Sequence, residues 1–356
     1  MELLKPNTDI LNFNKLYEML KKNQYSNYVL LGESTHGTED FYLTRLIITL
    51  ILVRDFGFRT IMFETEWSSG FELNLYIHSI IKEDISHLFN RLFNKFPKWM
   101  CNNEYIKSLI IFLKNWNLNN KTDKVYFYGI DCQDIDLAKK NVCNNDTINC
   151  KIVREIINNY YKMKGSNNYW NMRDRFWFNV IKQLSVNKDN KLVLWAHNSH
   201  IGNIKANKSP GKTINIGYLL DKAFGSFKIG FSTYEGTVKA SKSWGKPGVK
   251  KILKKGIEQS YESLFNLICD EINYNGIIYY SNPSLSIKKY FRYVGVIYKP
   301  NTEMVSHYKQ TNINKEFNIL IFFNRTSFLK PPSKKRRNKI FDYYLNQFNL
   351  LCLQQF

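Results

Sequence analysis

The sequence lacks the short motifs that usually identify a cofactor site or a catalytic nucleophile. It contains no CxxC pair, no HExxH, no GxGxxG and no GxSxG. These absences argue against a zinc ribbon or dithiol oxidoreductase, a zincin-type protease, a dinucleotide-binding site and a serine hydrolase with a nucleophile elbow. Any chemistry must therefore come from residues that are dispersed along the chain.

Long hydrophobic runs are also missing. The longest apolar stretch lies near 46–53, far shorter than the about 20 residues that a membrane-spanning helix needs. The N-terminus shows no hydrophobic core of a secretion signal, and the six cysteines have no metal-ligand spacing. We therefore expect a cytoplasmic protein with free thiols and no membrane partner.

Acidic residues are scarce. The chain has 51 Lys and Arg against 30 Asp and Glu, which gives a formal net charge of +21. Such a balance favours anionic partners, but frequent Lys, Asn, Ile and Tyr are also typical of an AT-rich genome, and this bias is the preferred interpretation. The one dense basic run, 334–337, is interpreted as a solvated loop. A nucleic-acid partner is not expected.

Four short apolar runs each end in polar residues, at 28–31, 60–63, 125–130 and 192–196. Each run is β-branched or aromatic and continuously apolar, which is typical of a strand covered on both faces. The stretch between the first two runs has helical spacing, with capping residues around Thr38 and a terminating Gly57. Strand, helix and strand in this order predict a βαβ unit and a parallel sheet.

The segments 69–120 and 151–186 have the pattern of helices, and no linker divides the chain. We therefore predict an α/β fold with a central, largely parallel sheet flanked by helices. The two helical segments are expected to form an inserted lobe. A single domain over residues 1–356 is the simplest organisation.

Ionisable residues follow these runs at the ends where parallel strands meet: Glu33, His36, Glu64, Asp131, His197 and His200. In an open parallel sheet, ligands bind beyond the carboxyl ends of the strands. Chance would scatter such residues over both ends of the sheet. Their convergence predicts a functional site at this edge.

His36 is the candidate general base, because histidine titrates near neutral pH and can take a proton from water. Glu33, three residues earlier, or Glu64 on the neighbouring strand can orient its imidazole. Arg45 on the following helix is a candidate partner for a buried carboxylate, or an oxyanion clamp. The alternative for His36 is a hydrogen-bonded structural histidine.

The pair His197 and His200 leaves several interpretations open. The two imidazoles can stabilise an oxyanion, protonate a leaving alkoxide or, with Glu64 or Asp131, bind zinc. Asp131 can instead hold a histidine or cap the next helix. Arg173 either faces the site or forms a surface salt bridge.

Taken in order, these motifs resemble the erythromycin esterase family over about residues 28–328. The resemblance rests on Leu31-Gly32-Glu33-Ser34-Thr35-His36-Gly37, Arg45, Phe63-Glu64, Arg173-Asp174, Trp195-Ala196-His197-Asn198-Ser199-His200, Gly217-Tyr218-Leu219, Ile229-Gly230-Phe231, and the closing Tyr298-Lys299-Pro300-Asn301-Thr302-Glu303 and Ser306-His307-Tyr308. It implies hydrolysis of a macrolide lactone by activated water, without a covalent serine intermediate and without a metal or other cofactor. Such an activity would confer antibiotic resistance.

The resemblance also assigns roles to the candidates. The expected catalytic residues are the base His36 with Glu33, Glu64, Arg45, His197 and His200. Asp131 and Arg173 are expected from their positions to bind substrate, and the resemblance adds Glu303 and His307. The resemblance does not choose between His197 and His200 as the second essential histidine.

Three functions are open at this stage. The first is a metal-independent hydrolase of a small ester or lactone. The second is a metal-assisted phosphoester hydrolase, which the +21 charge and the His, Asp and Glu residues at the sheet edge suggest. The third is a non-catalytic basic binding protein that reuses the fold.

Overall fold

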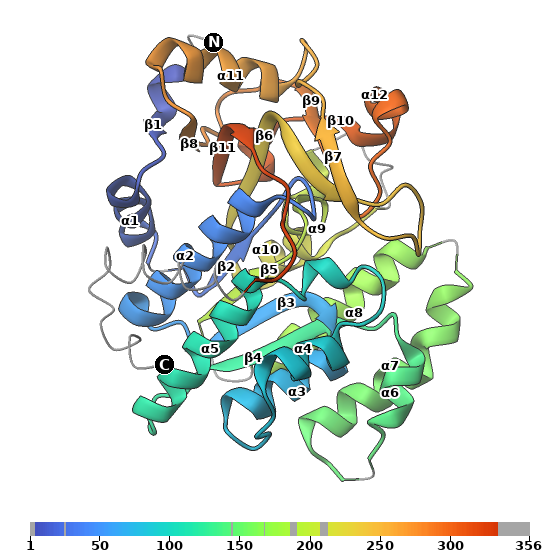
Figure 1. The fold of residues 1–356 in the computed structure, drawn as a ribbon. Coiled ribbons are helices and arrows are strands. Elements are labelled where there is room, and N and C mark those ends of the chain that lie inside the picture. The colour runs from blue at the N-terminus through green and yellow to red at the C-terminus, as the bar shows by residue number, and fades with distance from the viewer. Residues whose placement is uncertain are drawn as a thin grey trace.

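The computed structural model describes residues 4–24, 26–143, 145–166, 168–185, 191–206 and 213–333. Within these ranges a nine-stranded sheet runs through the molecule, with helices on both faces (Figure 1). Its strands are β1 (Thr8–Ile10), β2 (Tyr28–Leu31), β3 (Thr60–Glu66), β4 (Tyr126–Asp131), β5 (Leu192–Trp195), β6 (Phe227–Ala240), β7 (Val249–Leu253), β8 (Gly276–Tyr280) and β11 (Ile319–Thr326). A separate two-stranded sheet pairs β9 (Lys289–Arg292) with β10 (Tyr308–Thr311).

The helices that follow these strands divide between the two faces of the sheet. One apolar core lies between the sheet and α1 (Phe13–Lys22), α2 (Glu39–Phe56), α3 (Trp67–Ile77), α4 (Ile85–Leu92) and α5 (Glu104–Asn119). The other lies against α7 (Ile148–Lys164), α8 (Tyr169–Leu184), α10 (Ile216–Phe224) and α11 (Tyr261–Ile272). The short helices are α6 (Ile135–Lys140), α9 (Asn198–Ile201), α12 (Glu303–His307) and α13 (Ile313–Glu316).

The sheet has the order β1-β8-β11-β6-β2-β5-β3-β4, with β7 beside β6. The pairs from β11 through β6, β2, β5, β3 to β4 are all parallel, whereas β1, β7 and β8 pair antiparallel with their neighbours. The prediction of a central, largely parallel sheet flanked by helices is confirmed. The carboxyl ends of β2, β3, β4 and β5 therefore lie at one edge.

Helix α2 shows how local sequence sets the first crossover. It begins after Thr38, whose backbone is extended, and ends at Gly57, which has φ 73° and whose N–H donates to the carbonyl of Leu52. A left-handed residue of this kind is a common helix terminator, and glycine adopts it without a steric penalty. The predicted start and end of this helix are confirmed.

Helix α3 approaches β4 through a pair of glycines. A Cβ added to Gly70 would lie 1.9 Å from the backbone nitrogen of Gly129. We predict that Gly70→Ala lowers the free energy of unfolding by about 1–3 kcal/mol, because the added methyl group forces α3 away from the sheet. Denaturant unfolding measures the loss. Gly165→Ala is the control, since its Cβ meets only one atom, at 3.4 Å; equal losses in the two variants would contradict the prediction.

One expectation about the cysteines is wrong. Cys143 and Cys150 form a disulfide, with Cα atoms 5.3 Å apart, while Cys101, Cys132 and Cys269 are free and buried. The pairing depends on the turn that leads into α7, which brings the two cysteines within bonding range, and their spacing alone does not indicate it. No helix in the described ranges is long and apolar enough to cross a membrane. The basic run 334–337 lies outside the described residues.

Candidate active site

The turn after β2 places a histidine, a carboxylate and an arginine in one buried chain of contacts. Nδ1 of His36 lies 2.8 Å from Oε1 of Glu33, and Nη2 of Arg45 donates to the other carboxylate oxygen at 2.6 Å. The Arg45 guanidinium also lies 4.5 Å from the ring of Tyr42 and 4.6 Å from that of Trp195. Since an ionised carboxylate only accepts, the proton of the His36–Glu33 bond resides on Nδ1 of the imidazole.

The opposite nitrogen of His36 is thereby left as an acceptor. Nε2 makes no hydrogen bond with any described residue, although the side chain is only 9% exposed. Burial alone would lower the pKa of His36, but the hydrogen bond and negative charge of Glu33, helped by Glu64, outweigh it and raise the pKa. The geometry is that of a base oriented by a carboxylate.

His197 lies beside His36 in a different protonation environment. The two ring centroids are 4.8 Å apart. Nδ1 of His197 accepts from the backbone N–H of Ser199 at 3.3 Å and lies 2.7 Å from its hydroxyl, which places the ring proton on Nε2. Nε2 is buried and has no hydrogen-bond partner of good geometry in the described chain, although the backbone groups of Ser34 and Val294 lie close enough to the ring to raise its pKa in part. Burial, followed by the charges of His36 and His200, lowers the pKa of His197 well below its ordinary value. His197 is therefore a neutral N–H donor.

Glu64, near the end of β3, lies between the two histidines of the segment 196–200. One carboxylate oxygen accepts the backbone N–H of His197 at 2.9 Å, and the other lies 3.4 Å from Nη2 of Arg173 and 3.7 Å from Nε2 of His200. Burial would raise the pKa of Glu64, but the positive charges of His200, His36 and Arg173 and the backbone bond lower it. Glu64 is thus an ionised centre of the network.

His200 is immobilised on every side. Its Nδ1 lies 2.9 Å from Oδ1 of Asp174, and its ring is stacked on Trp170 at 4.2 Å and tilted against Trp177 at 4.5 Å. Asp174 is itself held by the backbone N–H of Ile216, at 2.7 Å. These contacts fix the ring that faces Glu64.

Asp131 holds Arg173 rather than a histidine. Nε and Nη2 of Arg173 donate to its two oxygens at 2.9 and 2.6 Å. The cap of α6 is Asp134, so Asp131 neither holds a histidine nor caps that helix, and its substrate-binding role stays a prediction. Burial would raise the pKa of Asp131, but the charge and hydrogen bonds of Arg173 lower it. Arg173 faces the site and is not a surface residue.

Glu303 and His307 lie in a neighbouring group. Glu303 is 3.4 Å from Nε of the buried Arg292. The ring of His307 bonds only to backbone, with Nε2 accepting from Lys299 and Nδ1 near the carbonyl of Tyr293. No hydrogen bond or ion pair between described residues joins either side chain to the catalytic set, so their substrate-binding role stays a prediction.

Sequence reasoning missed one buried carboxylate next to this site. Glu316 accepts from the hydroxyl of Tyr293 at 2.6 Å and that of Thr311 at 2.5 Å, and the Tyr293 ring lies 6.3 Å from that of His197. Burial raises the pKa of Glu316 to about 7, and the two hydroxyls and Lys309 offset this only in part. A single glutamate after a polar stretch carries no motif, and its burial arises from tertiary packing.

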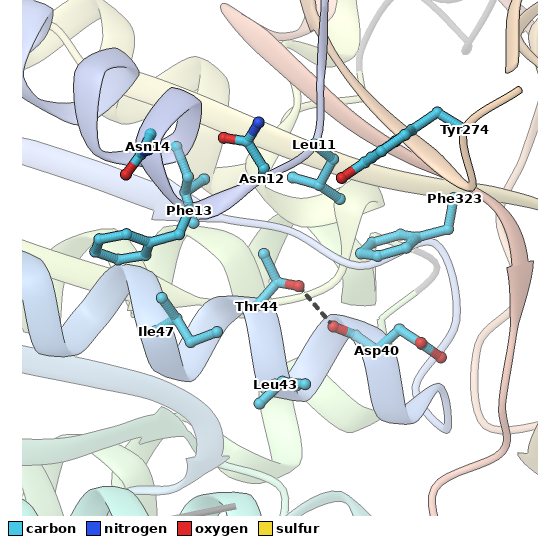
Figure 2. A pocket seen from close by; sticks show the side chains of 11 residues that line it. Leu11, Asn12, Phe13, Asn14, Asp40, Leu43, Thr44, Ile47, Tyr274 and Phe323 are labelled. Carbon is cyan, nitrogen blue, oxygen red and sulfur yellow. Dashed lines mark hydrogen bonds between the residues drawn. The ribbon is translucent and has the colours of Figure 1, made fainter. Parts of the chain in front are cut away.

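Two further features can mark an active site, a metal-binding cluster and a pocket. The described residues hold no group of three or more His, Cys, Asp or Glu side chains arranged to bind a metal. A pocket of about 670 Å³ lies between α1 and α2, with Tyr274 and Phe323 also in its lining (Figure 2). Asp40, Leu43, Thr44 and Ile47 line it, whereas Arg45 on the same helix points to Glu33.

Known proteins share both sequence and fold with this chain. The profile of the erythromycin esterase family matches residues 53–145 and 139–326. The chain belongs to the erythromycin esterase family. An erythromycin esterase type II from Escherichia coli is 30% identical over 103 residues, which are 29% of this chain and 23% of that relative. The alignment thus spans less than a quarter of the relative's length.

Solved structures similar to this family member share its fold over most of both chains. A Bacillus cereus protein superimposes with a TM-score of 0.71 at 17% identity, covering 92% of this chain and 97% of its own. A succinoglycan biosynthesis protein gives 0.71 at 17%, covering 91% and 96%. A mutant of the erythromycin esterase EreC in its open conformation gives 0.59 at 15%, covering 90% and 95%. Mixed α/β architecture is therefore shared at low identity.

Proposed function

We propose that this erythromycin esterase family member hydrolyses a carboxylic ester or lactone with water activated by His36. The observation that carries the proposal is the pair of histidines 4.8 Å apart whose pKa values are displaced in opposite directions. Two titratable groups whose environments separate their pKa values in this way are suited to distinct acid and base roles.

In the proposed reaction each step uses a side chain of this site. Nε2 of His36 takes a proton from water, Glu33 stabilises the resulting imidazolium through Nδ1–H, and the hydroxide attacks the carbonyl carbon. The Nε2–H of neutral His197 donates to the oxyanion of the tetrahedral intermediate. When the intermediate collapses, His36 returns its proton to the leaving alkoxide, which yields the acid and the alcohol.

The contacts favour His197 over His200 as the second histidine in contact with substrate. Nδ1 of the His200 ring lies 2.9 Å from Asp174, Nε2 lies 3.4 Å from Nη1 of Arg173 and 3.7 Å from Glu64, and the ring packs against two tryptophans. We assign to His200 the positioning of Glu64, which in turn holds the backbone of His197.

A phosphoester substrate is less well matched. A reacting phosphate needs cations to offset its charge, whereas each arginine here is already bound to a carboxylate, Arg45 to Glu33 and Arg173 to Asp131. A panel of macrolide lactones, 4-nitrophenyl carboxylates and 4-nitrophenyl phosphate, assayed with and without EDTA, separates the alternatives. We expect turnover of a lactone or carboxylate in EDTA. Turnover of the phosphate alone, dependent on added metal, would overturn the proposal.

The pH dependence of turnover reports the state of His36. Because the base must be unprotonated and its pKa is raised, kcat/KM should fall as the pH decreases through a midpoint above the ordinary histidine value of 6.5. Glu33→Gln removes the charge and the acceptor that raise this pKa, so the midpoint should move to lower pH. A pH–rate profile of both proteins measures the shift. An unchanged midpoint would show that another group controls the rate.

A further inference from the structure

A concentration of positive charge lies on one hairpin of the described structure. The segment 239–255, here the lysine hairpin, contains the end of β6, a turn and β7. It has seven lysines and no acidic residue: Lys239, Lys242, Lys246, Lys250, Lys251, Lys254 and Lys255. None of them forms an ion pair with a described residue, although the charge of Lys254 acts to lower the pKa of the nearby Glu303. Five of them are exposed. Genome-wide codon bias would spread lysines along the chain and does not account for this concentration.

The first strand of the hairpin borders the turn after β2 that carries Glu33 and His36, here the catalytic turn. The backbone N–H of Lys239 donates to the carbonyl of Gly37 at 2.9 Å, and Gly37 directly follows His36. The contact is tight, since a Cβ on Gly37 would lie 1.9 Å from the carbonyl oxygen of Lys239. The hairpin therefore begins in contact with the residue that follows the candidate base.

The turn of the hairpin packs against the segment 96–100. A Cβ added to Gly248 would lie 2.7 Å from the ring of Trp99, and Trp244 packs edge-on against Phe96 with ring centroids 5.0 Å apart. Met100, next in sequence to Trp99, accepts a hydrogen bond from the Tyr42 hydroxyl on α2. The hairpin and the segment 96–100 together border the catalytic turn, and Figure 1 shows the β6–β7 turn reaching toward the helices of the N-terminal half.

This border is positive on both of its sides. Lys98 is exposed in the 96–100 segment, and after burial its charge is the cause that lowers the pKa of Lys239. Two positive charges lie close to one another here, and neither forms an ion pair with a described carboxylate. Such an arrangement favours the binding of an anion beside them.

The charges of the inner site are arranged differently. Glu33 is bound by Arg45, Asp131 by Arg173, and Asp174 by His200. The reacting group is thus surrounded by paired charges, while unpaired positive charge lies outside it. An arrangement of this kind suits a substrate with a neutral ester group and a negatively charged group several bonds away from that ester.

We propose that the substrate is an ester or lactone bearing an anionic group, such as a carboxylate, that the lysine hairpin attracts to the entrance of the site. This inference rests on the proposed function and names its substrate class. A cationic ester would be disfavoured by the same field. Unpaired surface charge of one sign beside a cleft raises the local concentration of an oppositely charged ligand and accelerates its association.

Three esters of 4-nitrophenol with acyl chains of similar length provide the test: the pentanoate, the monoester of glutarate and the 5-aminopentanoate. We expect kcat/KM to be highest for the anionic ester and lowest for the cationic one, with the anionic ester favoured over the neutral one by about tenfold at low salt. This preference should shrink as the ionic strength rises and the Debye length falls to a few ångströms. An anionic ester hydrolysed no faster than the neutral one at low salt would overturn the inference.

A charge-removal variant localises the effect. The triple variant Lys239→Gln, Lys242→Gln, Lys246→Gln should lower the ratio of kcat/KM for the anionic and neutral esters by about tenfold. The matched control removes three exposed lysines from α7 and α8, namely Lys151, Lys162 and Lys182, and should keep the wild-type ratio. Equal effects in the two variants would show a general charge effect and overturn the inference. Absence of any ester hydrolysis, or hydrolysis that survives His36→Gln, would instead reject the proposed function.

Discussion

Replacing His36 with glutamine should lower kcat by about 10²–10⁴-fold on any ester that the protein hydrolyses, because a positioned general base contributes a factor of this size. Glutamine has a similar volume and can still reach Glu33, so the turn after β2 should persist. It cannot take a proton from water. Steady-state kinetics on the best substrate of the panel measures the loss, and thermal unfolding of the variant checks that the fold is intact.

The matched control for this variant is His87→Gln. His87 lies on α4 with its side chain 74% exposed, and among the described residues its ring pairs with Glu83 on the surface. Its replacement should leave turnover unchanged. If His36→Gln and His87→Gln had the same kcat, the residue that activates water would have to be sought elsewhere.

Replacing Arg45 with methionine should lower the free energy of unfolding by about 3–5 kcal/mol, the usual cost of leaving a buried charge without its partner. Both Arg45 and Glu33 are almost completely buried, and Glu33 would keep only His36 as a counter-charge. Methionine fills much of the same space between Tyr42 and Trp195, so the loss reports mainly the charge. Denaturant unfolding of wild type and variant gives the difference.

A second substitution separates charge from packing. In the double variant Arg45→Met, Glu33→Gln, the uncompensated carboxylate is gone, and we expect most of the stability to return. The double-mutant cycle gives the coupling between the two side chains directly. If the double variant were as unstable as Arg45→Met alone, the arginine would act through its contacts with the aromatic rings, not through its charge.

The strands and their ends were predictable because a buried parallel strand has a local signature. Residues 28–31 and 192–195 are continuously apolar, and each is followed at once by polar side chains, so the sheet edge carrying His36 and His197 follows from the pattern alone. The order of the strands was not predictable. Nothing in the sequence of β5 indicates that it pairs with both β2 and β3.

The partners of the histidines were harder to find than the histidines. Asp174 was visible only as part of a helical Arg-Asp pair, and its contact with His200 depends on how α8 packs beside α9. Glu316 gave no motif because its burial arises from tertiary packing. The seven lysines of the lysine hairpin are visible in the sequence, but their position beside Gly37 depends on the pairing of distant segments. Sequence patterns identify residues that follow a strand, whereas long-range packing decides which residues surround them.

The insertion of β5 between β2 and β3 has a consequence for how the protein is made. The hydrogen bonds at the centre of the sheet join residues near 30 and 61 to residues near 193, so they cannot form until that part of the chain has been synthesised. At about 5–20 residues per second, β2 leaves the ribosome roughly 10–30 s before its partner. During this interval the apolar edges of two nascent strands remain unpaired, which exposes them to aggregation, and chaperone binding would be most useful then.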